Sequence, residues 1–375
     1  MANTAALRAL TRSQKVTQLA AVALIVAAAV AEVLDAGAVA RFVMAGFALA
    51  ALAAVVGQAI EQVGERLGPS ATGLLQSTLG NLPELFVGLF ALRDGLVGVV
   101  RAALVGSVLG NAVLVLGCAF VAGGLRHGTQ RFDPEEPRLN ASLLLLVVTA
   151  LLVPTLAQRL GTPASSHTTA LSDVCAVILL LVYAATIPFY LRRGDAPSET
   201  RQPPAHDSQA HDSPARDSSE SAAWPLTLSV AILALASAGA ALASDWFVSP
   251  LRSATHSLGI SQAFTGLVIV AIASNAVEHA VGIRFALRAK PEFAVSTTLN
   301  SPLQVALLLT PVLVLLSPAV GPNPLTLVFP PLLIAALGAS ALVVAVIIYD
   351  GEYTWIEGVA LVGLYCIIAA AFWWG

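Results

Sequence analysis

Charged side chains are scarce in this sequence. Asp, Glu, Lys and Arg make up 11% of its 375 residues, whereas apolar residue types make up 57%. An ordinary soluble domain carries roughly 25% charged residues, so the composition excludes a soluble globular protein and indicates an integral membrane protein. The formal net charge is only −3. Because no basic surface is implied, we expect no nucleic-acid partner.

Cysteine and catalytic motifs are also nearly absent. The three cysteines, Cys118, Cys175 and Cys366, fall within apolar runs and have no CxxC spacing. We interpret them as small core residues, with no role in metal binding or redox chemistry. The sequence contains no HExxH, no GxSxG and no Asp-rich diphosphate motif. It therefore predicts no membrane-embedded enzyme and no cofactor.

Long apolar runs, in contrast, recur along most of the chain. A helix needs about 20 residues to cross a hydrocarbon core of roughly 30 Å. Runs of that length predict an all-α integral membrane protein, because a β-barrel would show short alternating segments instead. We expect about eleven transmembrane helices, near residues 16–34, 39–63, 69–92, 97–123, 139–158, 168–191, 224–248, 260–286, 293–317, 325–348 and 355–373.

The predicted organisation is one extra N-terminal helix followed by two five-helix halves. Residues 1–35 form the N-terminal segment and first helix, which we expect to be retained; a cleaved signal peptide is the alternative. The halves cover residues 36–192 and 224–375. Residues 193–223 are rich in Pro, Ser and Asp, and predict a disordered cytoplasmic linker. Its His206 and His211 could bind a metal, although a solvated tether is the favoured interpretation.

The distribution of Lys and Arg predicts the orientation. If the N-terminus is cytoplasmic, fourteen of these residues lie on the cytoplasmic side and five on the other side. This asymmetry agrees with the positive-inside rule. We therefore expect a cytoplasmic N-terminus and a C-terminus on the opposite side.

The two halves share a polar motif. The stretches "GNLPE" and "SNAVE" repeat the spacing Asn-x-x-Glu, and each is followed by an aliphatic run and Ala-Leu-Arg. One offset of 194 residues superposes three polar residues of one half on three of the other: Asn81 on Asn275, Glu84 on Glu278 and Ser107 on Ser301. The first motif helix would run outward and the second inward. Such inverted repeats are typical of secondary transporters, whose site lies near the midplane of the membrane.

A carboxylate at the middle of a membrane helix costs a few kcal/mol even on insertion scales, so we expect these glutamates to have a function. Asn and Glu at positions i and i+3 share a helix face, and each motif would present an amide and a carboxylate to the same point. Further oxygen ligands could come from Ser107, Asn111, Ser301 and Gln304. Close backbone approach or local unwinding is expected at Gly80, Pro83, Gly106 and Gly110.

This set of oxygen ligands with about two negative charges suits a hard divalent cation such as Ca²⁺. Without the cation, two neighbouring carboxylates repel one another and are expected to take up protons. Cation and proton would then compete for one site, as an antiporter with alternating access requires. His279, next to Glu278, could relay protons or tune that carboxylate; a hydrogen-bonded core histidine is the alternative.

Structural roles for the polar residues are also possible. Glu84 could form an ion pair with Arg93 or Arg101 that only holds helices together. Weaker site candidates are Glu61, Asp173 and Asp245, and the acidic group Asp133, Glu135 and Glu136 is interpreted as a solvated surface. An ion channel is a further class of function, but a channel would need no protonatable pair.

At these motifs the sequence resembles the Ca²⁺/cation antiporter superfamily, and within it the cation/proton exchangers. "SNAVEHA" is similar to the Gly-Asn-Ala-x-Glu-His pattern of their second repeat, and "GSVLGNAVLVLGCAFVAGGLRHGTQRF" to the segment after their first motif; the similarity covers about residues 50 to 320. The resemblance implies exchange of Ca²⁺ for H⁺, with Glu84 and Glu278 as central ligands and Asn81 and Asn275 beside them.

Pro83 is more reminiscent of the Na⁺/Ca²⁺ exchanger branch. A Na⁺-coupled Ca²⁺ exchanger or a Na⁺/H⁺ antiporter is therefore the alternative function, and Mn²⁺ and Na⁺ stay open as cargo. The expected partners are inorganic cations and the lipid bilayer, with the oligomeric state left open. The expected location is the plasma membrane of a bacterium.

Overall fold

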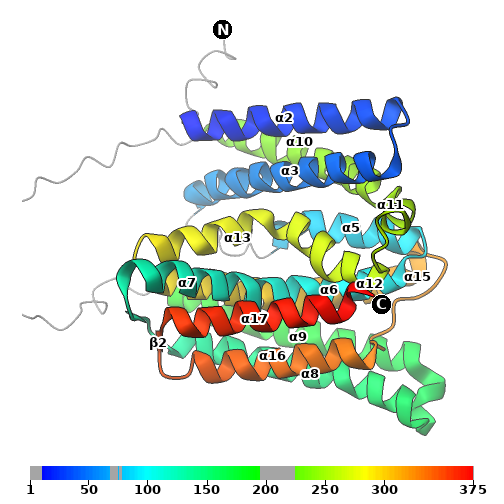
Figure 1. The fold of residues 1–375 in the computed structure, drawn as a ribbon, viewed down its shortest axis with the longest axis vertical. Coiled ribbons are helices and arrows are strands. Elements are labelled where there is room, and N and C mark those ends of the chain that lie inside the picture. The colour runs from blue at the N-terminus through cyan, green and yellow to red at the C-terminus, as the bar shows by residue number, and fades with distance from the viewer. Residues whose placement is uncertain (1–10, 68–74, 76–77, 195–223, 375) are drawn as a thin grey trace, which may run out of the picture.

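Apolar helices that lie nearly side by side make up most of the structure (Figure 1). The computed structural model describes residues 11–67, 75, 78–194 and 224–374. Up to the linker the helical segments are α2 (Arg12–Val33), α3 (Ala38–Leu67), α5 (Leu82–Arg93), α6 (Val97–Leu109), η1 (Gly110–Val115), α7 (Leu116–His127), α8 (Glu135–Leu160), η2 (Pro163–His167) and α9 (Thr168–Gly194). After it they are α10 (Leu226–Val248), α11 (Leu251–Leu258), α12 (Gln262–Phe264), η4 (Thr265–Val270), α13 (Ala271–Leu287), α14 (Pro291–Gln304), η5 (Val305–Leu309), α15 (Thr310–Val320), α16 (Pro331–Ile347) and α17 (Trp355–Trp373).

The all-α membrane architecture is confirmed. Within the described residues, nine helices are long and apolar enough to cross a membrane. They match nine of the eleven predicted spans. The predicted span 69–92 starts in residues outside the described part, and its described helix is the 12-residue α5. The predicted span 325–348 is represented by the 17-residue α16, so the count of eleven stays a prediction.

The predicted start of the span 325–348 is wrong. Residues 324–330 form no helix, and α16 begins only at Pro331. The backbone N–H groups of Leu325, Leu327 and Phe329 bond to hydroxyls from three other helices, at 2.7 Å (Ser317), 2.9 Å (Ser172) and 3.1 Å (Thr155). Non-helical backbone is tolerated at membrane depth only where protein satisfies it. The prolines at 324 and 330 disfavour helix before them, and the hydroxyls stabilise the non-helical backbone.

Three helices, α2, α3 and α10, form a layer on one side of the bundle (Figure 1). Within it, α3 and α10 pack closely at two points. A Cβ atom placed on Gly46 would lie 3.2 Å from the Phe247 ring, and one on Gly239 would lie 3.2 Å from the Leu52 side chain. One helix from each predicted half thus takes part in this close packing.

The π-helical segments give a second correspondence between the halves. Segment η1 ends at Val115 and η5 at Leu309, which are 194 residues apart (309 − 115). This spacing equals the offset that superposes the sequence motifs. Short π-helical turns inside α-helices frequently occur at functional sites. The sequence alone predicted regular helices here.

Helix α6 crosses η4 at very close range. A Cβ on Gly106 would lie 2.1 Å from the backbone oxygen of Leu267, and one on Gly266 would lie 2.6 Å from the backbone oxygen of Val99. The close backbone approach predicted at Gly106 is confirmed. The crossing brings the Ser107 end of α6 next to α13.

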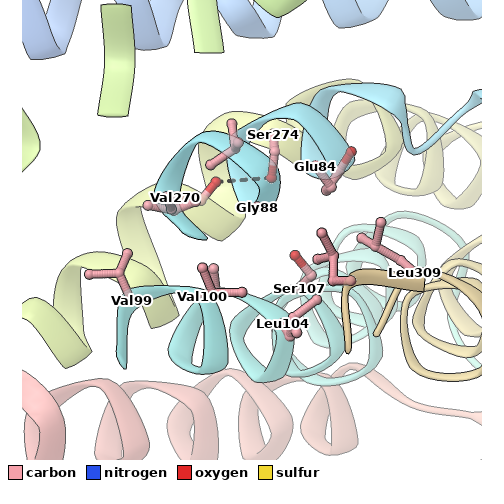
Figure 2. Close-up of a pocket in the computed structure, with 13 residues that line it drawn as sticks. Glu84, Gly88, Val99, Val100, Leu104, Ser107, Val270, Ser274 and Leu309 are labelled. Atoms are coloured by element: carbon pink, nitrogen blue, oxygen red, sulfur yellow. Dashed lines mark hydrogen bonds between the residues drawn. The ribbon is translucent and has the colours of Figure 1, made fainter. Parts of the chain in front are cut away.

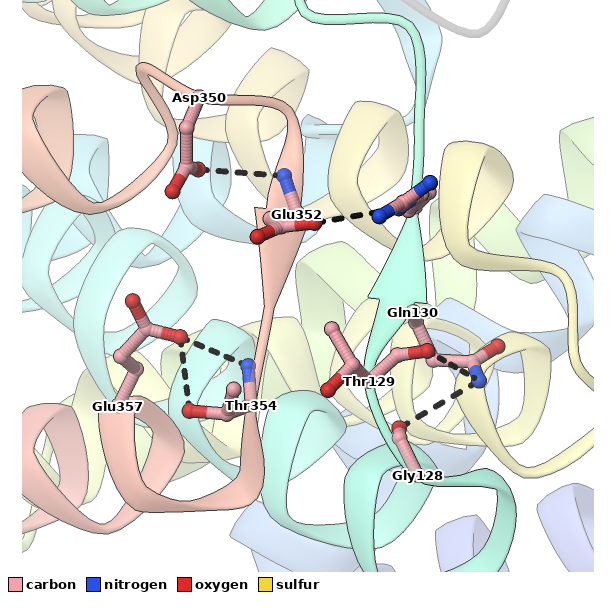
Figure 3. A network of polar contacts seen from close by, with 8 residues as sticks. Gly128, Thr129, Gln130, Asp350, Glu352, Thr354 and Glu357 are labelled. Carbon is pink, nitrogen blue, oxygen red and sulfur yellow. Dashed lines mark hydrogen bonds and ion pairs between the residues drawn. The ribbon is translucent and has the colours of Figure 1, made fainter.

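A short β-ribbon, which the sequence did not predict, ties two loops together (Figure 3). Strand β1 (Gln130–Arg131) pairs antiparallel with β2 (Glu352–Tyr353), and the Arg131 side chain forms an ion pair with Glu352 at 3.1 Å. The Tyr353 ring stacks on Phe120, with 3.9 Å between the ring centroids. The loops after α7 and before α17 must therefore lie on the same side of the membrane, as they do in the predicted topology.

Replacing Gly106 by Ala is expected to destabilise the protein. The new Cβ would collide with backbone of η4, and overpacking of this kind costs about 1–3 kcal/mol. The matched control is Gly98→Ala in the same helix, where a Cβ meets nothing within 4 Å. We expect a lower melting temperature in detergent for Gly106→Ala and an unchanged or slightly higher one for Gly98→Ala. Equal melting temperatures of the two variants would contradict the close crossing.

Candidate ion site

The polar residues predicted from the repeats converge where α5, α6, η1, α13 and α14 meet. Hydrogen bonds join most of them across the two halves of the chain. Six of the nine predicted site residues are buried: Asn81, Glu84, Ser107, Asn111, Asn275 and Ser301. The other three, Glu278, His279 and Gln304, are half-buried. The structure therefore assembles one site from two motifs that are 194 residues apart.

The first motif lies at the start of a helix. Gly80 and Asn81 form a turn, α5 begins at Leu82, and Pro83 stands in its first turn. Proline suits this place because the first turn has no use for its missing N–H. Glu84 consequently lies near the helix N-terminus, where free N–H groups and the helix dipole favour a negative charge. The interruption predicted around Gly80 and Pro83 is confirmed.

The second motif has a different backbone. Asn275 and Glu278 lie within the continuous helix α13, which follows the π-helical segment η4. Val277 stands where the first motif has Pro83, so nothing in the second motif breaks the helix. The two motifs match in sequence spacing but not in local structure.

Asn111 is the centre of the hydrogen-bond network. Its amide nitrogen lies 3.0 Å from Oδ1 of Asn275 and 3.1 Å from Oγ of Ser301. The Ser301 hydroxyl in turn donates to the Glu278 carboxylate. Asn275 completes the link by donating to Oγ of Ser107 at 3.0 Å. Through this network, the side chains that face Glu278 hold one another in place.

Two amide oxygens in the site have no donor. In the part of the chain that the structure describes, Oδ1 of Asn81 and Oδ1 of Asn111 are buried without a hydrogen-bond partner. The amide nitrogen of Asn81 is occupied, since it donates to Gln304 at 3.1 Å. An unpaired buried acceptor costs about 1–3 kcal/mol. A bound hard cation would satisfy both oxygens, because carbonyl-type oxygens are its preferred neutral ligands.

Glu84 borders a narrow cavity (Figure 2). Ser107 and Ser274 form the polar end of this cavity together with Glu84, and the remaining walls are apolar. The space between the lining atoms is about 360 Å³, including the part open to solvent. It follows α5 as far as Ala91 and α6 as far as Val99. Glu84 thus borders a space that extends toward the end of the bundle where α5 and α6 are joined.

The arginines considered as structural partners of Glu84 bond elsewhere. Arg93 forms ion pairs with Asp94 at 2.9 Å and with Asp245 at 2.6 Å. Arg101 donates to Oγ1 of Thr326 at 2.8 Å. The structure therefore contradicts an ion pair between Glu84 and either arginine. Asp245, one of the weaker site candidates, is therefore paired with Arg93.

Other predicted polar residues have separate surroundings. The Nε2 atom of His279 is buried without a hydrogen-bond partner among the described residues. The His279 ring packs over Gly110. The structure therefore does not support a core histidine that is held by a hydrogen bond through Nε2. Asp133 and Glu135 are exposed as expected. Glu136, in contrast, is half-buried and accepts hydrogen bonds from α14, through Oγ of Ser296 at 2.9 Å and the Asn300 amide at 3.1 Å.

The weaker candidates lie away from the site. Asp173 is half-buried on α9, outside the hydrogen-bond network of the site. Glu61 is exposed on α3. The proposed weak metal ligands His206 and His211 lie outside the described residues.

Ser274 is a site residue that sequence reasoning did not include. It lines the cavity beside Glu84. Its position, 194 residues after Gly80 and directly before the second motif, is the signal that could have identified it.

Comparisons with known proteins agree with this architecture. The family described as sodium/calcium exchanger protein matches residues 37–191 and 228–374. The chain is 36% identical to a Ca²⁺/H⁺ antiporter of Synechocystis over 338 residues, which cover 88% of this chain and 90% of the relative. It is 35% identical to the Ca²⁺/H⁺ antiporter ChaA of Bacillus subtilis over 328 residues, or 86% and 88% of the two chains. The solved structure of native YfkE aligns with a TM-score of 0.78 at 30% identity, covering 95% of this chain and 99% of that chain.

Replacing Asn111 by Ala is expected to weaken cation binding. The substitution removes the donor shared by Asn275 and Ser301, and we expect the Kd for Ca²⁺ to rise about tenfold, or about 1.4 kcal/mol. The measurement is the Ca²⁺-dependent increase of the melting temperature in detergent, because a ligand that binds only the folded state stabilises it.

Asn140→Ala is the matched control for this substitution. Asn140 is also a buried membrane asparagine, and it bonds across helices to Asn300 at 2.7 Å, outside the site. Both variants should melt earlier than the wild type without Ca²⁺, but only Asn111→Ala should lose the Ca²⁺-dependent increase. If Asn111→Ala kept the full Ca²⁺-dependent increase of the melting temperature, Asn111 would not belong to the cation site.

Proposed function

The chain belongs to the sodium/calcium exchanger protein family, and from this membership and the site we propose that it exchanges Ca²⁺, or a similar divalent cation, for H⁺ across a membrane. The two relatives described above are named Ca²⁺/H⁺ antiporters. The observation that carries the proposal is the hydrogen-bond network around Asn111, which leads through Ser301 to Glu278 and through Asn275 to Ser107 in the lining of the Glu84 cavity.

Charge balance explains how one site can serve both ions. Two carboxylates hold either one divalent cation or two protons with the same net charge. Carboxylate ligands have to be deprotonated to bind a metal, so loading of the cation releases protons and protonation releases the cation. With both arginines engaged elsewhere, no side-chain cation of the described residues competes for Glu84. The exchange therefore needs no other charged group at the site.

The ligand set suits a transported ion better than a resident one. The described residues contain no group of three or more His, Cys, Asp or Glu side chains that could hold a metal. The proposed site combines only two carboxylates with amide and hydroxyl oxygens. Fewer charged ligands and a less rigid site lower the affinity for Ca²⁺. A moderate affinity allows release on the far side of the membrane.

We further propose that the site opens alternately to the two sides of the membrane. The cavity beside Glu84 extends along α5 and α6 as far as Ala91 and Val99, and its lining does not include Glu278. The layer of α2, α3 and α10 packs against the helices that carry the site (Figure 1). Two inverted halves can exchange conformations, which opens the site to each side in turn.

We also propose an orientation in the membrane and a cellular location for the chain. The chain is a multi-pass membrane protein, and the distribution of Lys and Arg favours a cytoplasmic N-terminus. The proposed location is the plasma membrane of a bacterium. A Na⁺-coupled Ca²⁺ exchanger or a Na⁺/H⁺ antiporter is the second candidate, favoured by Pro83 in the first motif.

Uptake of ⁴⁵Ca²⁺ into inside-out vesicles or proteoliposomes with an imposed pH gradient tests the function. We expect the wild type to take up Ca²⁺ only with the gradient and also without Na⁺. Glu84→Gln and Glu278→Gln should each reduce uptake by more than about tenfold, because glutamine keeps the shape but not the charge of a ligand. Glu292→Gln, an exposed carboxylate in the first turn of α14, is the control and should transport like the wild type.

Each other outcome leads to a different conclusion. Uptake that requires Na⁺ and ignores the pH gradient would assign the chain to sodium-coupled exchange. Full uptake by both glutamine variants would contradict the paired carboxylates as the site. Absence of Ca²⁺ flux under either gradient would refute the calcium assignment.

A further inference from the structure

A row of polar side chains follows one face of α14, inside the membrane span that begins at Pro291. Ser296, Asn300 and Gln304 are spaced at i, i+4 and i+8, and a helix brings residues of this spacing to one face. All three are half-buried. Gln304 belongs to the ion site, because it accepts a hydrogen bond from Asn81 at 3.1 Å. The row thus leads from the site toward the beginning of α14.

A carboxylate lies at the outer end of this row. Glu136, in the first turn of α8, accepts hydrogen bonds from Oγ of Ser296 at 2.9 Å and from the Asn300 amide at 3.1 Å. It is half-buried, and the ion pairs among the described residues do not include it. Neutral donors stabilise a carboxylate without cancelling its charge. Glu136 therefore keeps its attraction for a cation at the point where the row begins.

The other half of the chain has no such row. The offset of 194 residues superposes the three polar residues on small residues whose side chains cannot form hydrogen bonds: Ala102, Gly106 and Gly110. Helix α16, which packs on α6, has Leu332 as its second residue, whereas α8 has Glu136 as its second residue. The equivalent helices of the first half therefore pack together without polar side chains at these positions. Packing alone does not require the row on α14.

The row and the cavity beside Glu84 lie toward opposite ends of the bundle. Segments α6, η1 and α7 form one apolar span, Val97–His127, so the loop before α6 and the loop after α7 lie at opposite ends of it. The cavity extends toward the loop before α6. Glu136 follows the loop after α7 and bonds to α14 there. Each end of the bundle thus has its own approach to the site.

We propose that the polar face of α14 is the route by which the transported cation reaches the site from the end of the bundle where α8 begins, and that the charge of Glu136 draws the cation into this route. The inference rests on the proposed function, since it assumes that a cation is exchanged at the site. Polar side chains within membrane spans are costly unless they face the bundle interior or water, and they mark ion pathways. In the proposed orientation, this end of the bundle is cytoplasmic.

A purely structural role for Glu136 makes a different prediction. In that case its hydrogen bonds from Ser296 and Asn300 only hold α8 against α14. Glutamine at position 136 would keep a carbonyl oxygen that accepts both bonds and would lose only the charge. A structural role therefore predicts unchanged transport by Glu136→Gln, whereas the proposed role predicts slower loading from one side of the membrane.

Uptake of ⁴⁵Ca²⁺ into membrane vesicles of both orientations, each with a pH gradient that drives uptake, is the decisive experiment. For Glu136→Gln we expect the KM for Ca²⁺ to rise about threefold or more when the end that carries Glu136 faces the medium, because the carboxylate no longer raises the local cation concentration. The KM in vesicles of the other orientation should stay at the wild-type value. The Ca²⁺-dependent increase of the melting temperature should also be unchanged, since the site itself is intact.

Glu135→Gln is the matched control for charge. Glu135 is an exposed carboxylate one residue earlier in the same turn of α8, so this variant loses the same charge from the same end of the bundle. We expect it to keep the wild-type KM in both vesicle orientations.

A cysteine variant tests the route independently of Glu136. A membrane-impermeant, positively charged methanethiosulfonate reagent should abolish most of the uptake by Ser296→Cys when it is added on the side of Glu136, and should have no effect from the other side. Ser142→Cys is the matched control, because Ser142 is exposed in the second turn of α8, and its uptake should persist. The three native cysteines are present in all these proteins, and the treated wild type gives the baseline.

The outcomes separate the parts of the inference. A wild-type KM of Glu136→Gln in both orientations, or the same rise in both, would overturn the role of Glu136. Uptake by Ser296→Cys that resists the reagent from both sides would overturn the route along α14. Failure of the wild type itself to exchange Ca²⁺ would instead refute the proposed function.

Discussion

A carboxylate inside a hydrocarbon layer has to be compensated, and the arrangement of this bundle depends on two of them. No arginine side chain neutralises Glu84, since Arg93 and Arg101 are engaged with Asp245 and Thr326. Its compensation comes from the N-terminus of α5, and that of Glu278 comes from Ser301. Dipoles of this kind stabilise a charge without cancelling it. The site therefore keeps its attraction for a cation, which a salt bridge would remove.

Compensation by dipoles requires that several helices approach one another closely. The donors and acceptors come from α5, α6, η1, α13 and α14, and each bond tolerates a distance range of only a few tenths of an ångström. Gly106 allows α6 to lie directly on the backbone of η4. The π-helical segments η1 and η5 follow Ser107 and Ser301 at equivalent places in the two halves. Close crossings and π-helical turns are thus part of the same construction as the site.

The site could be predicted from the sequence because its information is local or repeated. Asn81 and Glu84 share a helix face by spacing alone, and the 194-residue offset marks their partners Asn275 and Glu278. The π-helical turns, the ribbon of β1 and β2 and the non-helical residues 324–330 depend on distant contacts. The N–H of Leu327, for example, bonds to Ser172, 155 positions away. No local pattern identifies such a partner, and for the same reason the different backbones of the two motifs could not be foreseen.

The similarities and differences between the halves have separate consequences for transport. Where the halves match, as in the 194-residue spacing of η1 and η5, the proposed exchange of conformations would bring equivalent elements into equivalent places. Where they differ, the two end states cannot have equal free energy. Helix α5 begins at Leu82 in the first motif, but α13 continues through the second. An ion gradient drives exchange between unequal states as long as the difference is small compared with the binding free energies. In the proposed alternating-access cycle, the different backbones of the two motifs would therefore give the two end states different affinities for the cation.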